Sequence, residues 1–167
     1  MTVTVYSLLG EDHFVSLETI RCLRFQGNSN FDREWFGRIR YLVVNETEAE
    51  ILANVPIHEI EDARVASEEL LRLGAEVVLI TLGSSGSYYA TGTTYEYVPA
   101  FHVDPVDATA AGDCYCGALA VALVEGKSLY DSVRFASAAA ALSVSRLGAQ
   151  PSLPYRSEID QFMEDIT

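Results

Sequence analysis

The sequence of 167 residues has no long apolar run, few cations and few cysteines. No apolar stretch reaches the roughly 20 residues that a membrane-spanning helix needs, so we expect no transmembrane helix. Residues 1–6 lack the basic segment that begins a secretory signal, so we expect no such leader. There are 11 Lys and Arg against 24 Asp and Glu, which gives a formal net charge of −13. This charge argues against nucleic acid and against an anionic membrane surface as partners.

The three cysteines and three histidines do not form a metal-binding pattern. An odd cysteine count, with Cys114 and Cys116 separated by one residue, is typical of reduced thiols in a cytosolic protein. No further cysteine or nearby histidine completes a ligand set around this pair, so both are interpreted as small helix residues. The histidines stand apart in the sequence and have no triad-like setting.

Apolar residues make up 49% of the chain, which is enough for one folded domain with a hydrophobic core. Apolar runs predict buried strands, and apolar residues at helical spacing predict amphipathic helices. We expect strands at 2–9, 41–44 and 76–82, a hairpin of 87–91 and 94–100, and an extended segment at 101–106. We expect helices at 14–25, 31–39, 46–53, 59–73, 113–125, 129–146 and 156–164.

The order of these elements predicts an α/β fold, with a mostly parallel sheet flanked by helices. Ligands of such sheets bind beyond the carboxyl ends of the strands. Asn45, Gly83 and Asp107 each follow directly on a predicted strand. We therefore expect these three positions to converge on one edge of the sheet.

The small residues Ala110, Ala111 and Gly112 leave little side-chain bulk around the first amides of the helix that follows them. A helix start carries unpaired N–H donors and a positive dipole end, so this turn is a candidate anion site. Asp113, in the first turn, has two interpretations. It is either a stabilising helix-start carboxylate, or a catalytic base that takes a hydroxyl proton beside a bound phosphate.

Asn45 and Glu48 form a second polar cluster, at the start of the helix predicted at 46–53. Their spacing is that of a capping box, and the same spacing lets both side chains face a hydrated Mg²⁺. Gly83 and Gly86 either form a turn or let the backbone approach a nucleotide. Taken together, the functional interpretations suit phosphoryl transfer from ATP to a hydroxyl, which depends on positioning and charge neutralisation.

Four motifs resemble those of the ribokinase-like (PfkB-type) sugar kinases. They are Asn45-Glu-Thr-Glu48, Thr81-Leu-Gly-Ser-Ser-Gly86, Asp107-Ala-Thr-Ala-Ala-Gly-Asp113 followed by Gly117-Ala-Leu119, and the segment from Arg134 to Ser152. Their order and spacing resemble the family over about residues 31–165. The resemblance implies a partial ribokinase-like fold and assigns 31–167 to a nucleotide-binding and catalytic region, while residues 1–30 stay unassigned.

The resemblance implies ATP-dependent phosphorylation of a sugar, such as ribose to ribose 5-phosphate, in which Asp113 is the general base. It places the backbone amides of Ala110, Ala111 and Gly112 in an anion hole, and Ser137 near the adenine. It implies contacts to ATP for Asn45, Thr81, Leu82, Gly83, Ser84, Ser85, Gly86, Gly112 and Asp113. It places Glu48 at Mg²⁺ and implies a loop pair that holds a monovalent cation (K⁺), formed by Asp107, Thr109, Ser143, Arg146, Gly148 and Ser152.

Two departures from the family pattern bear on function. Ala108 stands where Thr is common and Cys116 where Asn is common, but no catalytic group is lost. Family members are about twice as long, and no Gly-Gly motif, sugar-binding polar residues or β lid of their N-terminal half is recognisable here.

Two hypotheses for the function therefore stay open. One is a sugar kinase for a ribose-like substrate in the cytoplasm, active as it stands or with a second copy or a complementing chain. The other is a truncated, non-catalytic nucleotide-binding or scaffolding remnant.

Overall fold

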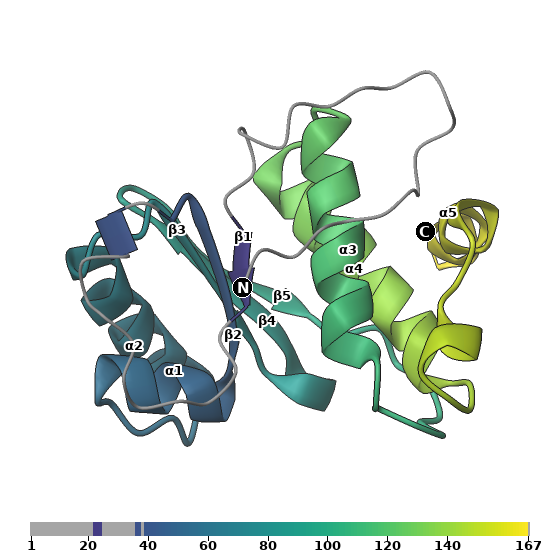
Figure 1. The fold of residues 1–167 in the computed structure, drawn as a ribbon, viewed down its shortest axis with the longest axis horizontal. Helices are drawn as coiled ribbons and strands as arrows, with labels where there is room; N and C mark the ends of the chain where they lie inside the picture. Colours follow the sequence, from purple (N-terminus) through teal and green to yellow (C-terminus); the bar gives the residue numbers. More distant parts are fainter. Residues whose placement is uncertain (1–21, 25–35, 38, 167) are drawn as a thin grey trace. The chain divides into compact units, whose positions relative to one another are not determined.

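The computed structural model describes residues 22–24, 36, 37 and 39–166 (Figure 1). The described residues fall into two compact units, one ending at Pro99 and the other beginning at Ala100. The strand predicted at 2–9 lies outside the described residues, as do most of the helices predicted at 14–25 and 31–39. None of the helices within the described ranges is long and apolar enough to span a bilayer.

The described part of the first unit contains one mixed sheet of five strands, whose order in the sheet follows the chain. The strands are β1 (Cys22–Arg24), β2 (Tyr41–Asn45), β3 (Val77–Thr81), β4 (Gly86–Thr91) and β5 (Tyr95–Pro99). Strands β1, β2 and β3 are parallel, whereas β3, β4 and β5 pair antiparallel. The predicted α/β class is confirmed, and β4 with β5 is the predicted hairpin.

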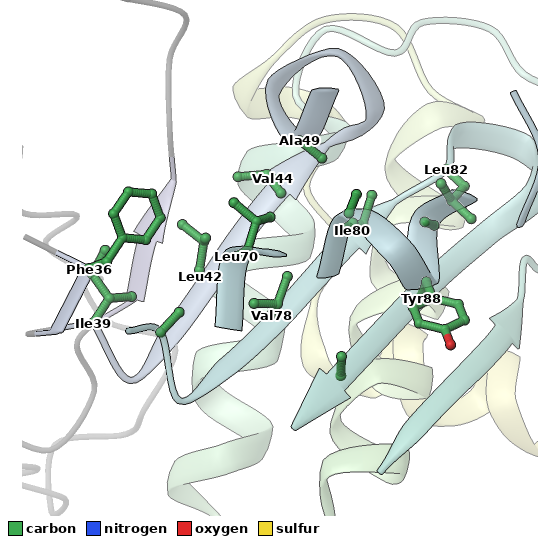
Figure 2. Close-up of a cluster of buried hydrophobic side chains, with 14 residues drawn as sticks. Phe36, Ile39, Leu42, Val44, Ala49, Leu70, Val78, Ile80, Leu82 and Tyr88 are labelled. Carbon is green, nitrogen blue, oxygen red and sulfur yellow. The ribbon is translucent and has the colours of Figure 1, made fainter. Parts of the chain in front are cut away.

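Helices α1 (Glu46–Ala53) and α2 (Ile60–Arg72) pack on this sheet, α1 against β2 and α2 against β3 and β4. Alternate residues of the strands face them, so Leu42 and Val44 of β2 lie beside Val78 and Ile80 of β3 (Figure 2). Leu70 of α2 packs into the same cluster and has no exposed surface. Burying each such side chain contributes about 1.5–3 kcal/mol, so this face is the core that holds β2 and β3 in register.

The turn from α2 into β3 depends on a close backbone approach. Gly74 has a φ of 121°, a conformation that favours glycine. A Cβ at this position would lie 2.9 Å from the Gly37 nitrogen. The glycine therefore allows the end of α2 to pass beside the segment that precedes β2.

The second unit is built on three helices, α3 (Ala111–Val124), α4 (Leu129–Val144) and α5 (Arg156–Asp165). Helices α3 and α4 pack against each other, and α5 packs on α4. Most buried residues of α4 are alanines and serines, and such small side chains allow close helix packing. Gly126, with a φ of 77°, ends α3, and the Ser128 side chain caps α4.

Two predicted elements are wrong. Residues 22–24 are a strand paired with β2, where a helix was predicted at 14–25; apolar spacing in a short segment does not separate the two states. Residues 101–106 form no strand. Pro105 has no N–H for a ladder, and the Val106 N–H donates to the Val144 carbonyl at the end of α4 at 2.7 Å.

Candidate functional site

Asn45 and Glu48 form a capping box at the start of α1. The Glu48 N–H donates to Asn45 Oδ1 at 2.9 Å, and the Asn45 N–H donates to Glu48 Oε2 at 2.9 Å. Asn45 is also the last residue of β2 and pairs in register with Thr81, the last residue of β3. The structure thus shows the capping interpretation, and it places Asn45 and Thr81 side by side at the carboxyl ends of two parallel strands.

The loop that follows β3 is closed by its own backbone. The Leu82 N–H donates to the Gly86 carbonyl at 2.7 Å, and the Ser85 N–H donates to the Leu82 carbonyl at 3.0 Å. The Tyr97 hydroxyl of β5 donates to the Ser85 carbonyl. Tyr97 is a contributor that the sequence analysis missed, because the alternation of a hairpin strand does not show which side chain will reach a loop.

Glycine is required at both ends of the short 3₁₀ turn Gly83–Ser85 (η2). Gly83 has a φ of 54° and Gly86 a φ of 122°, both in the region that favours glycine. Gly83, Ser84 and Ser85 are exposed, while Leu82 is buried and anchors the loop. The two glycines therefore form the turn, and the residues from Gly83 to Ser85 are exposed to solvent.

Helix α3 begins without a side-chain cap. Ala110 is its N-cap residue, whereas Ser128 caps α4 by accepting from the Asp131 N–H at 3.1 Å. The Ala111 N–H is held by the Ala108 carbonyl at 3.2 Å. Asp113 lies exposed in the first turn, at the position in α3 that Asp131 occupies in α4. An uncapped helix start with a carboxylate beside it can bind an anion and accept a proton.

Asp107 ties the segment before α3 to the loop after α4. Its Oδ1 accepts from the N–H of Thr109 at 2.9 Å and from the Thr109 hydroxyl, and its Oδ2 accepts from the Gly148 N–H at 2.9 Å. The Thr109 hydroxyl and the two amides hold the pKa of the Asp107 carboxyl below its ordinary value. Asp107 is therefore ionised at neutral pH and clamps two segments 41 residues apart.

The loop after α4 is fixed from inside by two buried serines. The hydroxyls of Ser143 and Ser152 are 3.0 Å apart, and Ser152 donates to the Ala149 carbonyl at 2.7 Å. Both serines are almost fully buried, with 0% and 1% exposure. Their hydroxyls, like the Asp107 carboxylate and the Thr109 hydroxyl, carry oxygen atoms, the ligand type that a hard cation takes.

Cys114 joins α3 to the same region. Its Sγ lies 3.4 Å from the Ala139 carbonyl of α4. Burial raises the pKa of this thiol to about 11, against a smaller opposing effect of the Ser143 hydroxyl. The thiol is therefore neutral and structural, as predicted from the sequence.

The Ser137 hydroxyl has no hydrogen-bond partner among the described residues, although Ser137 is only 8% exposed. A buried hydroxyl without a partner costs free energy, so such a group fits a site that a polar ligand completes.

The site residues predicted from the sequence fall into two groups. The first unit contains Asn45, Glu48, Thr81 and the loop 82–86, and the second contains Asp113, Ser137 and the loop pair around Asp107. The described residues contain no group of three or more His, Cys, Asp or Glu that could hold a metal.

Sequence reasoning missed Glu158, which binds the Arg146 side chain at the edge of the second group. Its capping-box spacing with Tyr155 was the available signal.

Comparison with known proteins gives a consistent result. The profile of the pfkB family of carbohydrate kinases matches residues 30–156. Ribokinase from Haemophilus influenzae is 40% identical over 131 residues, which are 78% of this chain and 43% of that protein.

Two solved structures are similar as well. Ribokinase from Thermotoga maritima has a TM-score of 0.74 and 40% identity, covering 81% of this chain and 46% of that chain. Arabidopsis thaliana ribokinase, solved with ribose and ATP, has a TM-score of 0.81 and 36% identity, covering 86% of this chain and 47% of that one. The chain therefore spans less than half the length of these relatives.

Proposed function

Because the chain belongs to the pfkB family of carbohydrate kinases, we propose that it carries out ATP-dependent phosphoryl transfer to a sugar hydroxyl, with Asp113 as general base. The observation that carries this proposal is the start of α3, where no side chain caps the helix and Asp113 lies exposed in the first turn. Ribose is the first substrate to test, because the relatives named above are ribokinases and one was solved with ribose and ATP.

The proposed reaction needs only proton transfer and charge stabilisation from the chain. The sugar hydroxyl gives its proton to the Asp113 carboxylate, its oxygen bonds to the γ-phosphorus of ATP, and the bond to ADP breaks. The amides of Ala110, Ala111 and Gly112, at the positive end of the α3 dipole, are proposed to stabilise the negative charge on the transferred group. For Ala111 this requires its N–H to exchange the bond to the Ala108 carbonyl for one to the phosphate.

The nucleotide is assigned to the strand ends and to α4. Asn45, Thr81 and the exposed backbone of 83–85 are proposed to contact ATP, and the unpartnered Ser137 hydroxyl suits a position near the adenine. One oxygen of Glu48 caps α1, and the other can accept from the water shell of Mg²⁺. When bound, Mg²⁺ neutralises phosphate charge.

The monovalent cation is assigned to the loop pair of Asp107, Thr109, Ser143, Arg146, Gly148 and Ser152. This pair can supply oxygen ligands from the Asp107 carboxylate, from hydroxyls and from the backbone carbonyls of Arg146 and Gly148, of the kind that replaces the hydration shell of K⁺. A cation bound there adds positive charge beside the start of α3 and so strengthens its attraction for a phosphate.

The decisive experiment compares Asp113→Asn with Asp131→Asn. Both aspartates lie at the third position of a helix, where replacing Asp by Asn removes only a charge–dipole attraction of about 0.3–1 kcal/mol, so neither change should unfold the protein. Sugar-dependent ADP release should fall by ~10²–10⁴-fold in Asp113→Asn, the usual loss for a general base, and should hardly change in Asp131→Asn. Circular dichroism checks the folding of each variant.

Equal rates for the wild type and Asp113→Asn would reject the catalytic assignment. A folded wild-type chain that is inactive toward ribose, fructose and nucleosides would reject the kinase proposal. In that case the chain would be a non-catalytic nucleotide-binding remnant.

A further inference from the structure

We infer that the ion pair between Arg146 and Glu158 positions the loop after α4, so that Arg146 governs cation binding through its side chain. The inference rests on the proposed function, because it concerns the loop assigned above to a monovalent cation. It assigns a positioning role to Glu158, which lies outside the four sequence motifs.

The ion pair is bidentate: two nitrogens of the Arg146 guanidinium face the two oxygens of the Glu158 carboxylate. Arg146 Nη2 lies 2.6 Å from Glu158 Oε1, and Nη1 lies 3.4 Å from Oε2. The two side chains are 33% and 37% exposed, so solvent screens the pair only in part. The Arg146 guanidinium, together with the Tyr155 N–H, holds the pKa of the Glu158 carboxyl below its ordinary value. The paired fork geometry restricts direction as well as distance, which a single contact does not.

Glu158 is itself held in place by helix α5. Its Oε2 accepts from the Tyr155 N–H at 2.6 Å and completes the cap of that helix. Helix α5 is anchored further by Arg156, which pairs with Glu125 at the end of α3 and lies 4.9 Å from the Phe135 ring of α4. Helix α5 therefore holds the Glu158 carboxylate in place, and the carboxylate in turn holds the Arg146 side chain of the loop.

The loop that Arg146 carries has no other ion pair among its described residues. Its ties to the α3 and α4 side include the Arg146 N–H to the Ser143 carbonyl at 3.1 Å, the Gly148 N–H to Asp107, and the Ser143–Ser152 contact. Each of these fixes one point of the loop from the α3 and α4 side. The Arg146–Glu158 pair ties the loop to α5, so its loss frees Arg146 from that helix and loosens the loop that we propose as the cation site.

The experiment measures K⁺ binding by thermal unfolding of the full chain. Choline chloride replaces KCl to keep the ionic strength constant, and the rise in Tm gives the half-saturating K⁺ concentration. The variants are Arg146→Met, which keeps the length of the stem, Arg146→Lys, which keeps the charge without the fork, and Glu158→Gln. The control is Glu61→Gln, which removes a surface ion pair with Arg64 in the first unit.

We expect Arg146→Met and Glu158→Gln to raise the half-saturating K⁺ concentration by about two- to thirtyfold, the range for a change that modulates a site from outside it. Arg146→Lys should lie between Arg146→Met and the wild type, and Glu61→Gln should match the wild type. In sugar-dependent ADP release by Glu158→Gln, the K⁺ activation constant should shift by the same factor while the rate at saturating K⁺ stays close to that of the wild type.

Three outcomes would overturn all or part of this scheme. Variants with a lower Tm at every K⁺ concentration but an unchanged half-saturation point would reject the positioning role and leave a merely structural ion pair. A wild-type chain without a K⁺-specific rise in Tm would reject the cation site and the inference with it. A K⁺-dependent Tm shift that changes in the variants, in a chain that releases no ADP, would reject the kinase activity and keep the positioning role.

Discussion

At the scale of single residues, Cys114 couples the packing of α3 and α4 to pH. Burial raises the pKa of the thiol to about 11, whereas a thiol in the unfolded chain titrates near 8.5. Between these values the unfolded chain loses a proton that the folded chain keeps, so the free energy of unfolding falls as the pH rises.

This effect predicts a specific difference between the wild type and Cys114→Ser. The wild type should lose about 2–3 kcal/mol of stability between pH 8 and pH 11 that Cys114→Ser does not lose, because serine does not titrate in this range. Urea unfolding of both proteins across this pH range measures the difference. Parallel stability curves would show that the native thiol titrates normally.

Residue identity alone could not decide the role of Asn45 and Glu48. Their spacing serves a cap and a hydrated cation equally well, and the hydrogen bonds with the backbone show that the cap is formed. The uncapped start of α3 could be predicted from Ala110, which has no side-chain acceptor. The buried Ser137 hydroxyl, which has no hydrogen-bond partner among the described residues, could not be predicted, because its burial depends on how α4 packs.

At the scale of elements, the turn between α2 and β3 is the connection that tolerates a side chain least. Gly74→Ala adds a Cβ 2.9 Å from the Gly37 nitrogen, at a φ of 121° that alanine rarely adopts. We expect a loss of about 1–3 kcal/mol in the free energy of unfolding.

Gly117→Ala is the matched control for this change. Gly117 lies inside α3 with no atom within 4 Å of a built Cβ, so alanine there should be neutral or stabilise by up to about 1 kcal/mol. Urea midpoints of the two variants provide the comparison. A Gly74→Ala midpoint equal to that of the wild type would mean that the segment around Gly37 moves aside at little cost.

Elements with a clear apolar run or a clear helical spacing of apolar residues were predicted well from the sequence. The apolar runs of β2 and β3 and the helical spacing of α2 place these elements to within one or two residues. The segments at 22–24 and 101–106 were mispredicted because their outcome depends on partners. The first pairs with β2, and the second is held by the end of α4.

At the scale of the whole molecule, the proposed nucleotide contacts predict that the ligand stabilises the folded chain against unfolding. We expect Mg-ATP to raise the Tm, because a ligand that binds only the folded state shifts unfolding by mass action. The matched control is Mg²⁺ without nucleotide at the same ionic strength. A folded protein whose Tm does not change at millimolar Mg-ATP would contradict the proposed site, and the net charge of −13 would then outweigh the local donors.

The pairing pattern of the sheet also predicts the order in which its strand pairs form during folding. Strands β3, β4 and β5 are joined by short turns, and hairpins of this kind close in about 1–10 μs. Strand β2 reaches β3 only after residues 46–76, with α1 and α2, have been brought together, and such long-range parallel pairing is slower. In the interval, the apolar edge of β3 is open to other chains. The yield of refolded protein should therefore fall as the protein concentration in the refolding mixture rises.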